Sequence, residues 1–327
     1  MADVVQWGVI ATGGIAEVVT GDLLRLADAR VLAVSSRLLP KAQEFAARHG
    51  IPRAYGDYRE LLADPDVDVV YVATPHAQHH EVTRAALLAG KHVLCEKAFT
   101  LTVADAEDVV DLARERGLFL MEAMWTRFNP LIRRVRELVA DGAIGHVRTI
   151  RADFGFAHEY RPGDRLWNPA LGGGSLLDLG VYPVSFAHML LGEPESVEVH
   201  GSLAPTGVDA EAALLLRYPD GAHALLSSSL TSAPEVSAVV IGTRGRIELP
   251  EPFYRPRVVT VHRAGAEPEE LRREIDGAGY TYQAQEVVDR IRAGDLESPE
   301  MPLDETLAVM RTLCTALDAL GVAFTAA

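Results

Sequence analysis

The sequence predicts an α/β protein in which an amino-terminal, doubly wound parallel sheet precedes an α+β domain with a large, mostly antiparallel open sheet. The chain has 327 residues, a length that favours two domains. Short apolar runs alternate with amphipathic stretches in its first part, and strand-like runs follow one another in its later part. Hydrophobic residues make up 48% and charged residues 24% of the chain, so each domain has enough apolar material for a compact core.

Strands and helices alternate in the first part of the chain. This alternation requires crossover connections, which favour a parallel sheet covered by helices. The predicted strands are Val4–Ile10, Val31–Ser35, Val67–Ala73, His92–Cys95 and Leu118–Met121, and the predicted helices are Ile15–Leu26, Lys41–His49, Gln78–Ala89 and Val103–Arg116.

The pattern changes after Trp125, where one predicted helix, 131–140, is followed by strands only. Turn signals such as Pro219-Asp220-Gly221 separate these strands, which favours antiparallel neighbours. The predicted strands cover residues 146–154, 198–203, 212–218, 223–229 and 236–241.

We place the domain boundary at residue 124, which gives a cofactor domain of residues 1–124 and a substrate and dimerisation domain of residues 125–327. Two helical segments, 280–293 and 304–320, complete the second domain. The sequence leaves open whether the last helix packs back on the first domain.

The charge of the chain disfavours several classes of partner. Its 31 basic and 46 acidic residues give a net charge of −15, which repels nucleic acid and acidic membrane surfaces. The amino-terminal segment shows no basic stretch followed by an apolar core, and no apolar run approaches membrane-spanning length. Two cysteines, Cys95 and Cys314, are too few for a disulfide framework. We therefore expect a cytoplasmic protein with no nucleic-acid or membrane partner.

A glycine loop, Ala11-Thr12-Gly13-Gly14-Ile15-Ala16, lies between the first predicted strand and the first predicted helix. This is the setting of a Rossmann dinucleotide site, in which a pyrophosphate binds at a helix amino-terminus. Ala11 occupies the usual place of the first glycine. The alternative is an ordinary tight turn between strand and helix.

The end of the second predicted strand bears on the choice of cofactor. NAD-binding proteins usually place a carboxylate there, whereas this chain has Ser36 and Arg37. A guanidinium can pair with a 2′-phosphate through two hydrogen bonds, and Ser36 can act as a further donor. The sequence therefore predicts NADP(H) rather than NAD(H). The alternative is a solvated arginine at the start of a loop.

Three further segments carry a resemblance to a known family: Ala73–His79 (ATPHAQH), Cys95–Ala98 (CEKA) and Gly172–Pro183 (GGGSLLDLGVYP). Together with the glycine loop they make the chain resemble the glucose-fructose oxidoreductase, inositol dehydrogenase and rhizopine-catabolism (Gfo/Idh/MocA) family. A fourth segment, Met121–Phe128 (MEAMWTRF), is similar to that of dimeric dihydrodiol dehydrogenases and NADP-dependent xylose dehydrogenases within this family.

The resemblance implies a Rossmann domain followed by a domain whose open sheet forms a substrate wall and a dimer surface. It also implies hydride exchange between NADP(H) and a carbinol carbon. One residue departs from the family pattern, because Ala98 stands where a proline is usual. If that proline fixes a cis bond, the Lys97–Ala98 bond must adopt cis without it or be trans.

Oxidation of an alcohol requires a group that takes the hydroxyl proton. Tyr182 can serve if a nearby ammonium lowers its phenol pKa, and Lys97 is the candidate for that ammonium. Asp178, four residues before Tyr182, can orient the substrate or Lys97 if one helix carries both residues. We expect a break in that helix at Pro183. The alternatives are that Lys97 is a surface lysine, that Asp178 is a helix cap and that Tyr182 is a half-buried core residue.

The remaining predicted site residues divide between cofactor and substrate. Thr74, Pro75 and His79 follow the third main strand, at the carboxyl edge where such sheets bind ligands. By resemblance Glu96 contacts the cofactor ribose. The predicted cofactor set is completed by Ala11, Thr12, Gly13, Gly14, Ile15, Ser36, Arg37, Lys97, Trp125 and Arg127, and the predicted substrate set is Arg165, Trp167, Asn168, Asp178 and Tyr182, with His158 and Tyr160 as weaker candidates.

Packing at the domain junction is the alternative role for Trp125 and Arg127. His76, His79 and His80 lack acidic or thiol partners at metal-ligand spacing, so we expect no metal. Gly172–Gly174 is interpreted as a flexible approach that lets the backbone come near a ligand.

These observations favour an NADP(H)-dependent oxidoreductase that acts on a small sugar, polyol or vicinal diol and forms a homodimer or a higher homo-oligomer. One alternative is a relative that cleaves glycosides through transient oxidation by a tightly held cofactor. Another is a noncatalytic protein that senses NADP(H), although such a protein needs neither Lys97 nor Tyr182.

Overall fold

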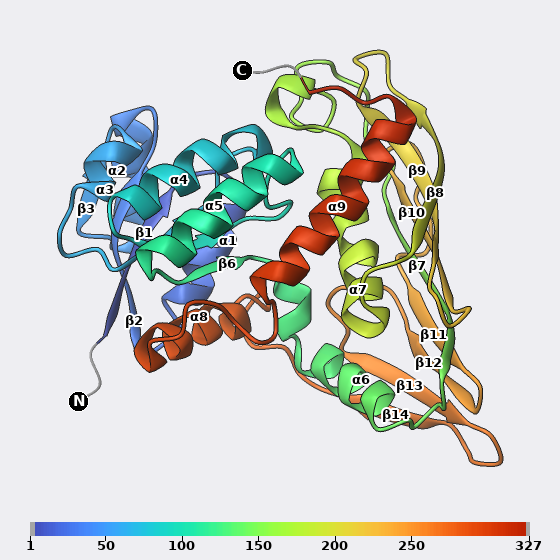
Figure 1. Cartoon of the computed structure of the whole chain (residues 1–327). Coiled ribbons are helices and arrows are strands. Elements are labelled where there is room, and N and C mark those ends of the chain that lie inside the picture. The colour runs from blue at the N-terminus through green and yellow to red at the C-terminus, as the bar shows by residue number, and fades with distance from the viewer. Residues whose placement is uncertain (1–3, 325–327) are drawn as a thin grey trace. The chain divides into compact units, whose positions relative to one another are not determined.

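The computed structural model describes residues 4–324, so the outermost ends of both predicted domains lie outside the described residues. The chain forms two compact units, both drawn in Figure 1. The Rossmann unit contains the chain up to Trp125 together with Asp276–Thr306, and the sheet unit contains Thr126–Ile275 and the chain from Leu307 onward. The predicted boundary at residue 124 assigns Asp276–Thr306 to the second domain, whereas in the structure this segment belongs to the Rossmann unit.

The Rossmann unit is built on a parallel sheet of six strands in the order β3-β2-β1-β4-β5-β6. The strand order reverses between β1 and β4, and in such sheets ligands bind outside the carboxyl ends of the strands at that point. The parallel sheet predicted from the sequence is confirmed. Its strands are β1 Val5–Ile10, β2 Ala29–Ser35, β3 Arg53–Tyr55, β4 Val69–Val72, β5 His92–Cys95 and β6 Leu120–Glu122.

Helix α5 of the Rossmann unit begins and ends where the local sequence supplies caps. Thr102 accepts a hydrogen bond from the backbone of Asp105 at the start of α5, and Gly117 ends α5 in the left-handed conformation. The helices are α1 Gly14–Leu23, α2 Leu39–His49, α3 Tyr58–Leu62, α4 His79–Leu88, α5 Val103–Arg116 and α8 Thr281–Ala293.

Helix α8 is the late segment that returns to the Rossmann unit, and it packs against α1 (Figure 1). The buried carboxylate of Asp22 in α1 accepts hydrogen bonds from the backbone N–H groups of Ala278, at 3.0 Å, and Tyr280, at 2.8 Å. Gly277 has a φ of +58°, and a Cβ there would lie 2.1 Å from Asp22 Oδ1. The final helix, α9 Leu303–Leu320, instead continues into the sheet unit from Leu307.

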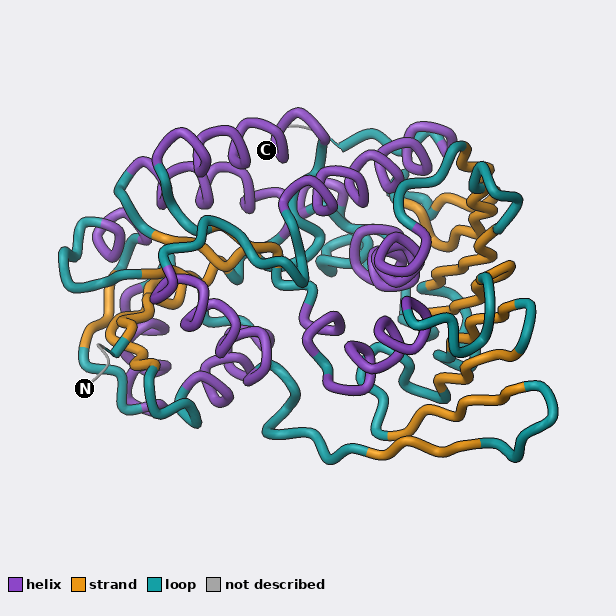
Figure 2. The backbone as a smooth tube through the Cα atoms, turned by 60° about the horizontal axis from the view of Figure 1, so that its bottom comes forward, coloured by secondary structure: helices purple, strands orange, loops and turns teal. Residues whose placement is uncertain are grey.

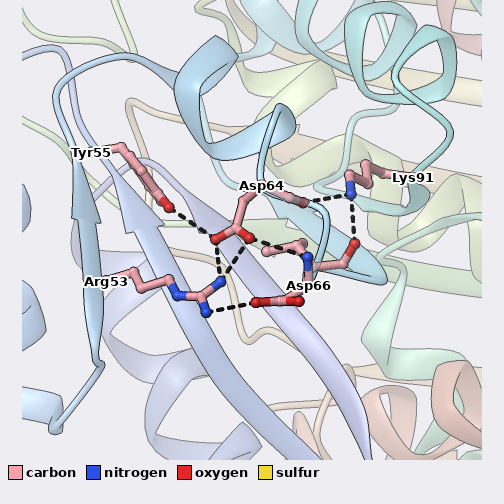
Figure 3. Close-up of polar contacts among 6 residues, drawn as sticks. Arg53, Tyr55, Asp64, Asp66 and Lys91 are labelled. Carbon is pink, nitrogen blue, oxygen red and sulfur yellow. Dashed lines mark hydrogen bonds and ion pairs between the residues drawn. The ribbon is translucent and has the colours of Figure 1, made fainter.

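Charged side chains form a hydrogen-bonded network near the amino-terminal ends of strands in the parallel sheet (Figure 3). Arg53, which opens β3, donates to both carboxylate oxygens of Asp64 at 2.7 Å and to Asp66 at 2.6 Å. Tyr55 also donates to Asp64, and Lys91 donates to the backbone carbonyl of Asp64 at 2.7 Å. Burial alone would raise the pKa of Asp64, but the hydrogen bonds from Arg53 and Tyr55 outweigh it and lower that pKa.

The sheet unit contains an eight-stranded sheet in the order β14-β13-β12-β11-β7-β10-β9-β8, in which the β7–β10 pair is parallel and the other pairs are antiparallel. Figure 2 shows these strands in orange. The predicted open, mostly antiparallel sheet is confirmed. The strands are β7 Val147–Gly155, β8 Ser196–Leu203, β9 Asp209–Arg217, β10 His223–Ser229, β11 Ala238–Gly242, β12 Gly245–Leu249, β13 Val258–Arg263 and β14 Glu269–Arg272.

The helices α6 Pro130–Ala140 and α7 Val181–Leu191 belong to the sheet unit, and α7 packs on β7, on β10 and on α6. The side chains of His188 and Thr312, 2.9 Å apart, connect α7 to α9. Among the described residues, the segment Pro169–Leu191 is long and apolar enough to span a membrane, yet 83% of its most apolar window is buried inside the structure. Such burial is typical of a core helix.

Candidate active site

The glycine loop leaves open space at the amino-terminus of α1. No side chain caps this helix, and a Cβ added at Gly13 or Gly14 would meet nothing within 4 Å. Ala11 has a φ of 92°, a conformation that favours glycine, which explains why glycine is usual at this position. The uncapped N–H groups and the open space fit a pyrophosphate.

The end of β2 lies beside this loop. The Thr12 and Ser36 hydroxyl oxygens are 3.5 Å apart, and Arg37 follows as an exposed residue. Over residues 4–324, no carboxylate forms an ion pair with Arg37. The guanidinium is therefore accessible to an anionic group of a ligand bound at the loop.

His79 connects the loops that follow β4 and β5. Its imidazole is fully buried, with Nδ1 2.8 Å from the Ala98 carbonyl oxygen and Nε2 2.9 Å from that of Thr74. Burial lowers the pKa of His79 and favours the neutral ring. His76 makes a similar contact with the carbonyl of Lys97 at 3.2 Å. The structure thus gives both histidines contacts that hold the Lys97 loop, and in the described part of the chain no His, Cys, Asp and Glu side chains gather into a candidate metal site.

Glu96 and Lys97 are positioned by the end of β5. Tyr71, fully buried in β4, donates a hydrogen bond to Glu96 Oε1 at 2.5 Å, and the Lys97 N–H lies 3.3 Å from Glu96 Oε2. Burial and the Glu96 carboxylate raise the pKa of Tyr71. The Lys97–Ala98 peptide bond is cis. Tyr71 was not predicted as a site residue. A tyrosine inside a fully buried strand indicates that its hydroxyl has a buried hydrogen-bond partner, so this signal was available in the sequence.

Trp125 and Tyr280 stack within the Rossmann unit. Their ring centroids are 4.3 Å apart with an interplanar angle of 24°, and Trp125 is 5% exposed. Asp22 holds the backbone of Tyr280 in place. Tyr280 was not predicted, because only the return of the chain to the Rossmann unit brings it beside Trp125. Contact between Trp125 and a cofactor stays a prediction.

The second group of predicted residues lies on one helical run in the sheet unit. A π-helix, Leu176–Gly180, leads directly into α7, and the run continues through Pro183, which lies in the first turn of α7. The helix is not broken at Pro183, and the irregularity lies earlier, in the π-helical turn that ends at Gly180. Asp178 and Tyr182 are 5% and 7% exposed, so both are largely buried.

Arg165 and Asp178, both predicted for the substrate side, form an ion pair. Arg165 Nη1 lies 3.0 Å from Asp178 Oδ1, and Nη2 lies 3.4 Å from Oδ2. The Arg165 side chain is 56% exposed and that of Asp178 8%. The guanidinium thus partly covers a buried carboxylate from the solvent side.

Trp167 and Asn168 shape the loop that carries Arg165. Trp167 is 2% exposed in a core cluster with Leu179, and its indole N–H donates to the Glu159 carbonyl at 2.9 Å. Asn168 accepts a hydrogen bond from the backbone of Ala170 at 3.0 Å. Both residues have local structural contacts, and contact with a substrate stays a prediction for them.

Two aromatic residues that the sequence interpretation missed pack around Tyr182. The ring centroids of Phe154 and Tyr254 lie 5.2 Å and 5.4 Å from that of Tyr182. Phe154 and Tyr254 stack on each other at 4.7 Å with an interplanar angle of 5°. No sequence signal connects them, because they lie one hundred positions apart in the chain.

Arg127 contributes to the same region of the sheet unit. It is 2% exposed, and its guanidinium donates to the side chain and the backbone carbonyl of Ser185, each at 2.9 Å. These bonds brace α7 one turn after Tyr182. A role of Arg127 in cofactor binding stays a prediction, as does the pairing of Tyr182 with Lys97, which belongs to the Rossmann unit.

Together the fold and the site define a Rossmann oxidoreductase, and comparison with known proteins agrees. Residues 5–124 match the model for the oxidoreductase family with an NAD-binding Rossmann fold, and residues 132–248 match the GFO/IDH/MocA C-terminal domain. The chain belongs to the Gfo/Idh/MocA family. It is a dehydrogenase or reductase that acts on CH–OH groups.

Dihydrodiol dehydrogenases are among the relatives of this chain. The chain is 39% identical to the trans-1,2-dihydrobenzene-1,2-diol dehydrogenase of Mus musculus over 328 residues, covering 98% of both chains. The Homo sapiens enzyme of the same name is also 39% identical, over 331 residues and 98% of both chains. Among solved structures, KijD10, a 3-ketoreductase from Actinomadura kijaniata in complex with NADP and TDP-benzene, is 29% identical with a TM-score of 0.85, covering 97% of this chain and 98% of its own.

Proposed function

We propose that this protein transfers hydride between NADP(H) and a carbinol carbon of a small sugar or vicinal diol. The observation that carries the proposal is the full-length similarity to dihydrodiol dehydrogenases combined with Tyr182 and Lys97 at the positions where the family motifs stand. Its relatives and structural neighbours include a diol dehydrogenase, an aldose-aldose oxidoreductase and a 3-ketoreductase, and all three names concern CH–OH chemistry.

The preference for NADP(H) rests on Arg37. Its exposed guanidinium follows β2, beside the open glycine loop, and suits a 2′-phosphate better than an unmodified ribose. Replacement of Arg37 by alanine should weaken NADPH binding by about 10- to 100-fold, since a charge-assisted hydrogen bond contributes about 1.5–3 kcal/mol. NADH binding should change by less than about twofold. Equal affinity of the wild-type protein for NADPH and NADH would contradict this preference.

Tyr182, Lys97 and Asp178 have different roles in the proposed reaction. The bound nicotinamide supplies the hydride acceptor or donor. Tyr182 takes the proton of the substrate hydroxyl during oxidation and returns it during reduction. Lys97 favours the phenolate of Tyr182 through its positive charge, and Asp178, paired with Arg165, orients the substrate hydroxyls.

The surroundings of Tyr182 favour a cyclic substrate with an apolar face. Phe154 and Tyr254 present aromatic rings beside the phenol, while Asp178 supplies the polar contact on the same helical run. A vicinal diol on a ring, or a pyranose, offers both kinds of surface. A screen of NADP⁺ reduction with D-xylose and trans-1,2-dihydrobenzene-1,2-diol as the first two compounds tests this directly.

Tyr182→Phe and Lys97→Met test the mechanism, with NADPH binding measured separately. We expect turnover to fall by at least about 100-fold in Tyr182→Phe, because general acid–base catalysis contributes about 10²- to 10⁴-fold. NADPH affinity should remain within about threefold in Tyr182→Phe. Turnover close to that of the wild type in both variants would exclude the proposed roles.

We also propose a homodimer that forms through the face of the eight-stranded sheet opposite to the face on which α7 packs. Leu225 in β10, 42% exposed, lies between Leu215 of β9 and Arg151 of β7 on that face. Leu225→Glu should convert a dimer into a monomer in light scattering, whereas Leu203→Glu, at the end of the edge strand β8, should not. A wild-type protein that is monomeric at micromolar concentration would exclude this interface.

A further inference from the structure

Asp209, the first residue of β9, is a fully buried carboxylate outside the predicted site. Among residues 4–324, no cationic side chain pairs with it. A buried charge of this kind costs several kcal/mol unless donors compensate it. The groups that face Asp209 must therefore explain its presence.

Those groups belong to the start of the helical run that carries Asp178 and Tyr182. Asp209 Oδ2 accepts hydrogen bonds from the Leu176 backbone N–H at 2.6 Å and from the Ser175 hydroxyl at 2.7 Å. The Ser175 hydroxyl also lies 2.9 Å from the hydroxyl of Ser228 in β10. The carboxylate thus compensates the positive end of the helical run, where a negative charge is favourable.

The backbone at Gly174 lies close against this carboxylate. Gly174 has a φ of +120°, and a Cβ there would lie 2.1 Å from Asp209 Oδ1. The Leu176 N–H that Asp209 holds is two residues before Asp178, and only the π-helix separates it from α7. A shift at this contact therefore passes directly to Asp178 and Tyr182.

We propose that Asp209 is a positioning residue, whose buried carboxylate determines where the helical run begins and thereby where Asp178 and Tyr182 stand. This inference rests on the catalytic roles proposed above for those two residues. Asp209 itself acts through Ser175 and Leu176 and not by contact with the substrate.

The protonation of Asp209 gives the inference a pH dependence. Burial raises the pKa of Asp209 to about 6, although the hydrogen bonds from Ser175 and Leu176 oppose that rise. The groups that face Asp209 are the Ser175 hydroxyl and the backbone N–H groups of Ser175, Leu176 and Asp209 itself. The nearest charged group along the helical run, Asp178, is paired with Arg165. As the pH falls through about 6, Asp209 becomes neutral and its hydrogen bond to Leu176 weakens.

Asp209→Asn tests the inference with little change in side-chain shape. Glu211→Gln is the matched control, since Glu211 lies two residues along β9 and contacts Ser202 and Thr231 instead of the helix start. Three quantities are measured from pH 5 to pH 8: kcat with the sugar or diol that the wild type oxidises, the NADPH dissociation constant, and amide hydrogen exchange over residues 174–184.

In Asp209→Asn we expect kcat at pH 7.5 to fall about 10- to 100-fold, as expected when reacting groups are misplaced, with the NADPH dissociation constant within about twofold. Exchange over residues 174–184 should accelerate. In the wild type, kcat and exchange protection should both decline below about pH 6, and this decline should be absent from Asp209→Asn. Glu211→Gln should match the wild type throughout.

Wild-type kcat and exchange protection in Asp209→Asn would overturn the inference. A lower unfolding temperature with unchanged kcat would also overturn it, because Asp209 would then be structural only. If Asp209→Asn does not fold, Ser175→Ala removes one donor and keeps the charge, and it should reproduce the faster exchange. If the wild type oxidises no sugar or diol, the proposed function fails, and the exchange measurement alone still decides whether Asp209 holds the helix start.

Discussion

Two glycine runs in this protein precede helices, and they serve opposite purposes. At Gly13 and Gly14, an added Cβ would meet nothing within 4 Å. At Gly173 it would lie 2.7 Å from the carbonyl oxygens of Arg165 and Leu166, and at Gly174 it would lie 2.1 Å from a buried carboxylate oxygen. The first run leaves room for a ligand, whereas the second is filled by the protein itself.

The interpretation of the second glycine run, Gly172–Gly174, is not the one that the sequence suggested. The second run was expected to let the backbone approach a ligand. In the structure, the groups that approach Gly173 and Gly174 are the Arg165 loop and Asp209. Whether the space beside a glycine is empty or filled by the protein is therefore decided by residues far away in the chain.

The largest effect should come from filling the second run. In Gly173→Ala the new methyl group would meet backbone atoms, which cannot rotate away, so we expect the free energy of unfolding to fall by about 3 kcal/mol. Urea denaturation measures this change. Gly163→Ala, where an added Cβ meets nothing within 4 Å, should change stability by no more than about 0.5 kcal/mol. Equal stabilities of the two variants would refute the crowding.

Filling the first run should affect binding instead of folding. In Gly13→Ala we expect a change of about 0.5 kcal/mol or less in the free energy of unfolding, because the space around Gly13 is empty. NADPH should bind at least about tenfold more weakly, a loss of about 1.4 kcal/mol, because the methyl group occupies the space next to the helix amino-terminus. Fluorescence titration with NADPH measures the affinity.

Gly21→Ala is the control for Gly13→Ala, since Gly21 lies within α1, the helix that Gly13 precedes, and nothing lies within 4 Å of a Cβ added there. It should stabilise the protein by up to about 1 kcal/mol, because alanine is the better helix former, and leave NADPH affinity unchanged. Unchanged affinity in Gly13→Ala would mean that the open loop does not bind the cofactor.

The smallest effect concerns the residue that opens the first run. Ala11 has a φ of 92°, so Ala11→Gly relieves backbone strain but adds freedom to the unfolded chain. We expect a net stabilisation of about 0.5 kcal/mol, measured as a small rise in the unfolding temperature. Ala104→Gly in the first turn of α5 should lower that temperature, because no strain is relieved there. A lower unfolding temperature in Ala11→Gly would show that Ala11 is not strained.

Much of the Rossmann unit could be predicted because its signals are local. The alternation of β1, α1 and β2 is visible in the order of apolar runs, and family motifs lie in continuous segments around His79 and Lys97. The motif around Tyr182, in the sheet unit, is continuous as well. Helix α3, the strands β3, β12, β13 and β14, and the π-helix before α7 were not predicted. Each has at most 6 residues and depends on its neighbours for stability.

The sequence by itself determined the α/β class, the family, the glycine loop and the place of Arg37, because each depends on residues close together in the chain. The tertiary structure alone decided which groups meet across long separations. It stacks Tyr280 on Trp125, pairs Arg165 with Asp178 and brings Asp209 to the helix start. These contacts depend on how separate elements pack on each other, and periodicity shows which face of an element is buried but not which residue it meets.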